Sequence, residues 1–259
     1  MNKLLSRCRS LLATPLLLAL TLGSAEVYAQ NVEEPQPDYA QPASASDPYE
    51  SWNRKVFSFN DAVDRWFLRP VAQTYRTVTP DIVDRGVTNF FSNLTELRNF
   101  TNSLLQLKGE SAVVAAGRFT YNTVFGLGGI FDVATAFDLP ERPEDFGQTL
   151  GYWGVGSGPY LVLPFLGPAT PRYFTGMGTD GFLLPSAWDQ VSSPETYYLR
   201  GLQLIDMRAG LIPAEQFISG DRYTFVRNAF LQRREFLIND GKITEDPFAD
   251  EDDFMFDDF

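Results

Sequence analysis

The sequence contains no histidine, and its single cysteine is Cys8. Beyond Cys8, the missing imidazole and thiol exclude Ser-His-Asp and Cys-His catalysis, disulfides within the chain, and zinc sites built on thiolate or imidazole. Only carboxylate, hydroxyl, lysine or arginine chemistry remains. We therefore expect no metal site and no cofactor.

The chain also lacks an uninterrupted apolar run long enough to cross a bilayer near its N-terminus. Basic residues precede a short apolar run over residues 11–22, and a small residue, Ala29, ends the segment. This is the organisation of a signal peptide, and we expect cleavage of residues 1–29. Cys8 superficially resembles a lipoprotein site, but Arg7 directly before it and its position ahead of the apolar run argue against acylation.

Basic residues are scarce. The chain has 21 basic and 33 acidic residues, and residues 245–259 supply eight acids and no base. The part from 47 to 244 is therefore close to neutral, which gives no support for nucleic-acid binding. Arginine dominates its basic residues, which suits forked contacts to carboxylate or phosphate, although a GC-rich genome would give the same bias.

Both flanks of the main domain have compositions typical of disorder. Residues 30–46 are rich in Pro, Ala, Ser and acids, and we expect a flexible linker. Residues 245–259 carry four phenylalanines among eight acids, and we expect a disordered acidic tail. The tail is either a solvating segment or a docking peptide. The helical domain is predicted to span 47–244.

An amphipathic helix opens this domain. Asp47 is suited to cap it, and Pro70 is expected to end it. Apolar residues recur at alternating spacings of three and four, which predicts one narrow stripe facing a core. The stripe consists of Tyr49, Trp52, Val56, Phe59, Val63 and Trp66. Phe57 and Phe67 lie off the stripe, where a single protein core does not explain them.

Helical patterns dominate the rest, so the fold class is mainly α. A helix is predicted over 83–107 and a helix-turn-helix hairpin over 111–139. Residues 140–185 hold seven prolines and nine glycines, which predicts a loop-rich region without long helices. Further helices are predicted over 194–207 and 213–239.

The hairpin over 111–139 is too apolar for a water-exposed surface. Arg118, Asn122 and Asp132 interrupt it, so it is not a plain transmembrane span. This favours an amphipathic body lying in one leaflet. The alternative is a buried hairpin in the core of a soluble protein.

Other motifs give little chemistry. The glycines around 126–129 and 154–158 match no dinucleotide or P-loop pattern and are suited to tight turns or close helix approach. Glu141, Glu144 and Asp145 cluster on a proline-rich turn. We interpret them as a solvated surface, with a carboxylate-dependent hydrolase as the alternative.

Four segments together resemble one family. They are "NRKVFSFNDAVDRWFLRPVAQTY", "RFTYNTVFGLGGIFDVA", "DFGQTLGYWGVGSGPYLVLPFLGP" and "RNAFLQRREFL". In this order, over residues 47–241, they are similar to the VacJ/MlaA family. The resemblance implies a compact ring-like bundle of amphipathic helices with a Gly/Pro-rich loop region, seated in one membrane leaflet. It also implies a second, membrane-facing surface, where we expect Phe57 and Phe67 to meet lipid.

The resemblance also implies a function. Family members are not enzymes. They sit in the inner leaflet of the Gram-negative outer membrane and remove phospholipid mislocalised to the outer leaflet through a central amphipathic channel. The lipid passes to a soluble periplasmic carrier, and the proteins associate with trimeric porins. The alternative for this chain is a porin-binding scaffold whose effect on lipids is indirect.

By motif match, eight residues are candidates to line the channel: Val56, Phe57, Phe59, Gly128, Gly129, Phe131, Tyr160 and Val162. The chain departs from the family in one respect. Typical members carry a cysteine after the apolar run of the leader, whereas Gln30 follows the expected cleavage site here. We therefore expect a non-lipidated member that the helical body itself holds on the membrane.

Overall fold

The structure is a computed structural model that describes residues 47–182 and 194–242. It is mainly helical, as predicted. The helices are α3 (Glu50–Val63), α4 (Arg69–Val78), α5 (Asp81–Leu105), α6 (Gly109–Val124), α7 (Phe146–Tyr152), α8 (Pro171–Phe182), α9 (Glu195–Leu211) and α10 (Arg222–Ile238). The expected signal peptide, linker and acidic tail lie outside the described residues and stay predictions.

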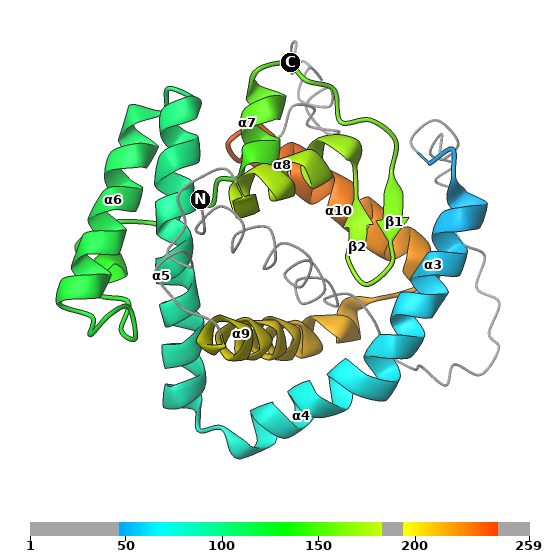
Figure 1. Cartoon of the computed structure of the whole chain (residues 1–259), viewed down its shortest axis with the longest axis horizontal. Coiled ribbons are helices and arrows are strands. Elements are labelled where there is room, and N and C mark those ends of the chain that lie inside the picture. The colour runs from blue at the N-terminus through cyan, green and yellow to red at the C-terminus, as the bar shows by residue number, and fades with distance from the viewer. Residues whose placement is uncertain (1–46, 183–193, 243–259) are drawn as a thin grey trace, which may run out of the picture.

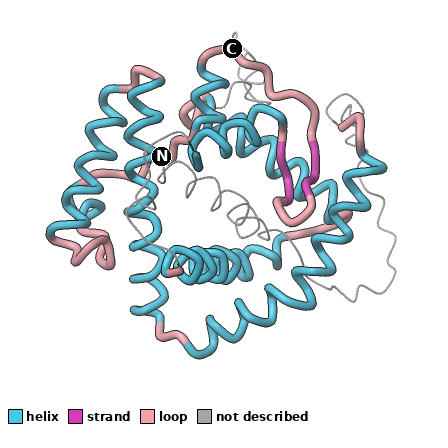
Figure 2. Tube along the Cα trace, in the orientation of Figure 1, coloured by secondary structure: helices cyan, strands magenta, loops and turns pink. Residues whose placement is uncertain are grey.

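Shorter elements connect the helices. A π turn, η2 (Asp64–Leu68), joins α3 to α4, and two 3-10 turns are η3 (Ala134–Phe137) and η5 (Ile212–Phe217). The only strands of the described part are β1 (Leu161–Leu163) and β2 (Gly167–Ala169), an antiparallel pair with Val162 opposite Pro168. Figure 2 shows this single hairpin among the helices.

The elements follow one another round a ring (Figure 1). α5, α4, α3 with the β hairpin, and the group of α7, α8 and α10 form its circumference. α9 lies along α4 on the inner side, and α6 lies outside against α5. The ring-like arrangement of amphipathic helices is thus confirmed.

Pro70 does not end the first helix. α3 passes through η2 directly into α4, and Pro70 lies in the first turn of α4. Proline is tolerated there because the π turn changes the hydrogen-bond pattern before it. The rod ends instead at Thr79, whose extended backbone conformation (φ −90°, ψ 121°) is the one favoured before a proline.

Asp47 does not cap α3 either. Tyr49 holds the cap position, without a side-chain hydrogen bond. Asp47 is buried instead, where it accepts a 2.8 Å hydrogen bond from the Asn53 Nδ2 and another from the Tyr223 hydroxyl. Its carboxylate therefore joins α3 to α10.

The region from 140 to 185 contains a helix longer than predicted. The twelve-residue α8 begins at Pro171, a position where proline costs no hydrogen bond. Gly176 lets α8 lie against α7, since an added Cβ would overlap the backbone of Gly147. At Gly147 and Gly176 glycine thus serves helix contact, whereas an added Cβ at Gly154, Gly156, Gly178 or Gly181 would meet nothing within 4 Å.

The predicted hairpin over 111–139 is wrong in its second half. α6 is the only long helix in it, and η3 is a single turn. The long partner of α6 is α5, which precedes it.

Candidate functional site

The aromatic stripe of α3 faces outward, contrary to the prediction. Trp66 is 84 % exposed, and Tyr49, Trp52 and Phe59 are also exposed, whereas Val56 is buried. Phe57, expected to meet lipid, is only 8 % exposed, whereas its off-stripe companion Phe67 is 75 % exposed, as expected. The buried face of α3 and η2 is a mixed one, formed by Asn53, Val56, Phe57, Asn60, Asp64 and Leu68.

Two asparagines explain why this mixed face is the inner one. Asn53 donates to the Tyr160 carbonyl (3.0 Å) and accepts from the Val162 amide (2.8 Å). Asn60, seven residues on and so on the same face, donates to the carbonyl of Leu163 and accepts from the amide of Phe165. The two amides bind β1 as a neighbouring strand would, which turns the aromatic rings outward.

α5 has the same inverted polarity. Its exposed face includes Ile82, Val83 and Leu104. Its buried residues are mostly polar: Gly86, Phe91, Asn93, Glu96, Asn99, Asn102 and Ser103. Apolar surface of this extent is unfavourable in water and marks contact with a membrane or a partner protein. In the described part, no helix is both long enough and apolar enough to cross a bilayer.

An apolar groove lies between α5, the loop after α6, and α9. Its volume is about 440 Å³. Within the described part of the chain, no charged side chain lines the groove. The lining residues are Ile82, Val83, Gly86, Val87, Phe90, Phe91, Ile130, Phe131, Leu199 and Leu202. A surface hollow without hydrogen-bonding side chains can accept a hydrocarbon but offers nothing to a polar ligand.

The glycine turn "GLGG" places Ile130 and Phe131 in this groove. Gly128 and Gly129 have positive φ angles of 75° and 97°, which glycine adopts at no steric cost. A Cβ on Gly129 would lie 2.6 Å from the Asn93 Cβ, so the turn touches α5 there. Asn89 on α5 then donates a 3.0 Å hydrogen bond to the Ile130 carbonyl.

A buried ion pair fixes the same loop from the other side. The Arg118 Nε lies 2.6 Å from the Glu96 Oε1, and both side chains are almost fully buried. Burial raises the pKa of Glu96, and its hydrogen bonds from Asn99 and Arg118 act in the opposite direction. The Asn122 Nδ2 donates a 3.1 Å hydrogen bond to the Asp132 Oδ1. The polar residues that interrupt the apolar run are thus internal anchors.

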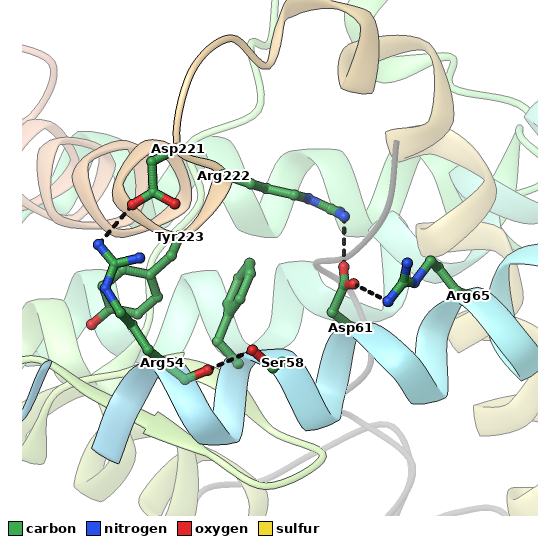
Figure 3. A pocket seen from close by; sticks show the side chains of 8 residues that line it. Arg54, Ser58, Asp61, Arg65, Asp221, Arg222 and Tyr223 are labelled. Carbon is green, nitrogen blue, oxygen red and sulfur yellow. Dashed lines mark hydrogen bonds and ion pairs between the residues drawn. The ribbon is translucent and has the colours of Figure 1, made fainter. Parts of the chain in front are cut away.

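A second hollow, of about 330 Å³, is charged (Figure 3). Arg54 lies 2.7 Å from Asp221, and Arg222 and Arg65 lie 2.6 and 3.1 Å from Asp61. The hydrogen bond from Arg54 holds the pKa of Asp221 below its usual range. Glu50 also lies 2.7 Å from Arg54, so each of the three guanidinium groups is paired with a carboxylate. The forked geometry of a guanidinium also suits the anionic oxygens of a ligand.

The structure divides the eight predicted channel residues between separate places. Phe131 lines the apolar groove, and Gly128 and Gly129 form the turn that carries it. Phe59 is exposed beside Phe165. The remaining four belong to the buried core: Val56, Phe57, Tyr160 and Val162. That the eight line a channel stays a prediction.

Sequence reasoning missed the groove residues of α5 and α9. Val83 and Val87 lie within the helix predicted over 83–107, but helical spacing alone does not show that they line a groove. Nothing in the spacing of Leu199 and Leu202 showed that they would meet α5 and Phe131.

The acidic cluster near 141–145 is only in part the solvated surface we expected, since Glu141 alone of its three acids is exposed. Glu144 is buried, with its oxygens bonded by Gln106 and Lys108. Asp145 forms a two-pronged pair with Arg234 and caps α7. These acids join α7 to α5 and α10 and line neither hollow, which leaves the hydrolase alternative without support. No cluster suited to a metal occurs among the described residues.

Comparison with known proteins decides the family. The sequence profile of the MlaA lipoprotein family matches residues 45–237. The chain belongs to the MlaA lipoprotein family. It is 37 % identical over 204 residues to the "Intermembrane phospholipid transport system lipoprotein MlaA" of Escherichia coli K12, covering 76 % of this chain and 80 % of the relative. The protein of the same name from Haemophilus influenzae is 34 % identical over 223 residues, covering 84 % and 89 %.

A solved MlaA-family structure has the same fold. It is described as "Structural basis for maintenance of bacterial outer membrane lipid asymmetry" and superposes with a TM-score of 0.67 at 36 % identity. The match covers 75 % of this chain and all of that one. The family resemblance seen in the four sequence segments is therefore confirmed, and so is the helical fold.

Proposed function

We propose that this protein transports phospholipid at the outer membrane: it removes mislocalised phospholipid from the outer leaflet and passes it to a soluble periplasmic carrier, which maintains lipid asymmetry. One observation carries the proposal. In a chain of the MlaA family, α3 and α5 turn their polar faces inward and their aromatic and aliphatic faces outward. Such a body is stable where its outer surface meets hydrocarbon.

The exposed rings support a seat in the periplasmic leaflet. Trp52, Trp66 and Phe67 project from the continuous rod of α3, η2 and α4. Tryptophan combines an apolar ring with a polar N–H and is favoured where lipid meets water. The rod lies on the circumference of the ring (Figure 1), so these side chains can enter the leaflet without a spanning helix.

Moving a phospholipid poses two opposed physical demands. The headgroup loses hydration in an apolar passage, and the acyl chains expose apolar surface in a polar one. A path with one polar and one apolar flank lowers both costs. The charged hollow of Arg54, Arg65 and Arg222 supplies groups that can meet a phosphate, and the apolar surfaces of α5 and α9 supply the other flank.

A porin is the second partner that we propose, and an exposed aromatic patch supports it. Tyr121 lies with its ring centroid 5.9 Å from Phe125 and 5.2 Å from Phe137. Exposed rings in contact are typical of protein interfaces. The same patch favours the second candidate function, a porin-binding scaffold with an indirect effect on lipids.

The test is phospholipid in the outer leaflet of intact cells, measured by its accessibility to added phospholipase. Deletion of the gene is expected to raise it several-fold, and the wild-type gene is expected to restore it. Unchanged accessibility after deletion would contradict the proposal.

A variant with Phe125→Ser and Phe137→Ser separates direct transport from the porin-binding scaffold. If porin no longer copurifies while purified protein still transfers lipid between vesicles, transport is direct.

A further inference from the structure

The apolar groove between α5, α9 and Phe131 has a shape that suits one ligand chemistry. The lining residues of α5 run from Ile82 to Phe91 on one face, a length of roughly 13 Å at 1.5 Å per residue. An apolar hollow of this length accommodates a hydrocarbon chain. Its volume of about 440 Å³ lies in the lower part of the ligand-pocket range, roughly 300–1,000 Å³, which leaves room for one chain but not for a two-tailed lipid.

The walls of the groove are built rather than incidental. Gly86 forms its floor beneath Ile130, since an added Cβ would meet the Ile130 Cγ2 at 3.1 Å. The Asn89–Ile130 hydrogen bond and the contact of Gly129 with Asn93 hold the opposite wall at a set distance from α5. Polar groups thus fix the position of the loop whose Ile130 and Phe131 line the groove.

Polar groups lie beside the groove. Asp206 on α9 accepts hydrogen bonds from Tyr75 and from Thr88, which lies along α5 between the lining residues Val87 and Phe90. This buried carboxylate disfavours an anionic headgroup inside the groove. A chain lying in the groove would therefore have its phosphate outside.

We propose that this groove binds one acyl chain of a phospholipid while the headgroup stays outside it. The inference rests on the proposed function, which makes phospholipid the ligand, and adds the place where one tail is held. Binding removes the exposed faces of Ile82, Val83 and Phe131 from water, which favours an apolar ligand. The second tail remains in the leaflet.

The test is photolabelling of the full-length protein in nanodiscs of phosphatidylethanolamine and phosphatidylglycerol. A trace phospholipid carries a diazirine at the middle of one acyl chain, and adducts are located by mass spectrometry. We expect peptides covering residues 82–91 and 130–131 to be labelled several-fold more than the peptide containing Trp66. Labelling no higher than at Trp66 overturns the proposal, because it would indicate general contact with the bilayer.

A matched pair of variants sharpens the test. Val83→Trp fills the groove from an exposed position, and Val113→Trp makes the same change on α6, away from the groove. Labelling of the groove is expected to fall at least fivefold in Val83→Trp and to stay unchanged in Val113→Trp. Equal labelling of the two variants overturns the proposal.

A cysteine pair tests whether the chain itself fills the groove. In a Cys8→Ser background, Val83→Cys and Leu184→Cys would join under oxidation if the segment before α9 lay there. Absence of this disulfide in lipid supports the proposal, and complete disulfide formation with and without lipid overturns it. The gene-deletion experiment distinguishes failure of the acyl-chain site from failure of the transport function. If the wild-type gene restores lipid asymmetry but the groove is not labelled, the proposed site is wrong and the proposed transport function is not contradicted.

Discussion

At the residue scale, Gly129 marks the closest approach between the loop after α6 and α5. Its neighbour Gly128 also has a positive φ, but a Cβ there would meet open space. Alanine at Gly128 would therefore introduce backbone strain alone, whereas alanine at Gly129 would introduce the same strain together with steric overlap. Alanine at a positive φ costs roughly 1–2 kcal/mol, and forced overlap adds roughly 1–3 kcal/mol.

We expect Gly129→Ala to lower the free energy of unfolding by roughly 2–5 kcal/mol and Gly128→Ala by roughly 1–2 kcal/mol. The measurement is denaturant unfolding of the protein in mild detergent, followed by circular dichroism. Hydrogen exchange should show faster opening of residues 126–137 in Gly129→Ala alone. Equal losses for the two variants would show that the contact with Asn93 contributes nothing.

At the element scale, α7 is held to α10 by one carboxylate. The Arg234 guanidinium lies 2.5 and 2.9 Å from the two oxygens of Asp145. Burial acts to raise the pKa of Asp145, but the hydrogen bonds and charge of Arg234 outweigh it and leave this pKa below its usual range. The folded state therefore releases this proton more readily than the unfolded chain, whose aspartate pKa is about 3.9.

The sign of the pH effect follows. The pair stabilises the fold above the unfolded pKa, and its contribution is lost as pH falls through the lower folded pKa. Asp145→Asn is expected to lower the Tm at pH 7 and to lose less Tm between pH 7 and pH 3 than the wild type. Asp221→Asn, at a half-exposed site, serves as the control with a smaller effect. Parallel Tm curves for Asp145→Asn and wild type would contradict this account.

The helices themselves were predictable, but their faces were not. Alternation of three and four residues correctly predicted α3, most of α5, α6, α9 and α10. The rule that apolar side chains face a core assumes water outside, and it assigned Trp52 and Trp66 inward. The signal that could have corrected it is the second stripe of Asn53, Asn60 and Asp64, polar residues with the same spacing.

The groove could not be predicted from the sequence, because it forms only in the tertiary structure. Val83 and Val87 belong to a recognisable helical stripe, but Phe131 and Leu202 come from elements far away in sequence. Their meeting depends on the Gly129 turn and on α9 crossing the ring beside α5. Spacing within one helix carries no information about such contacts between elements.

At the scale of the whole molecule, the outer face of the rod α3–η2–α4 should govern membrane binding. We expect Trp66→Ser with Phe67→Ser to weaken binding to vesicles of phosphatidylethanolamine and phosphatidylglycerol by roughly tenfold or more, since burying one such ring contributes roughly 1.5–3 kcal/mol. Flotation of vesicles with bound protein measures it. Gln73→Ser, an exposed polar position on α4, should bind like wild type. Equal binding of the two variants would mean that another surface meets the lipid.

A buried charge network joins distant parts of the chain. Arg208 on α9 bonds both oxygens of Asp64 in η2, at 2.7 and 3.0 Å, and also Glu215 in η5. The side chains of Arg208 and Asp64 are each about 1 % exposed. Burial would lower the pKa of Arg208, but the two carboxylates raise it, so the guanidinium stays charged. Asp64 and Arg208 lie 144 residues apart, so their pairing fastens the first rod to the C-terminal helices.

Arg208→Met should therefore affect both α9 and the N-terminal rod. It removes the guanidinium that Asp64 and Glu215 share, although Glu215 keeps Arg69 at 3.3 Å, and loss of one partner of a buried pair costs roughly 3–5 kcal/mol. Arg65→Met breaks the more exposed pair with Asp61 and should cost less than about 1 kcal/mol. Hydrogen exchange measures the reach of the change. Because the pair joins α9 to η2, protection should fall in α3 and η2 as well as in α9, whereas a loss confined to α9 would show that the N-terminal rod holds its place without this network.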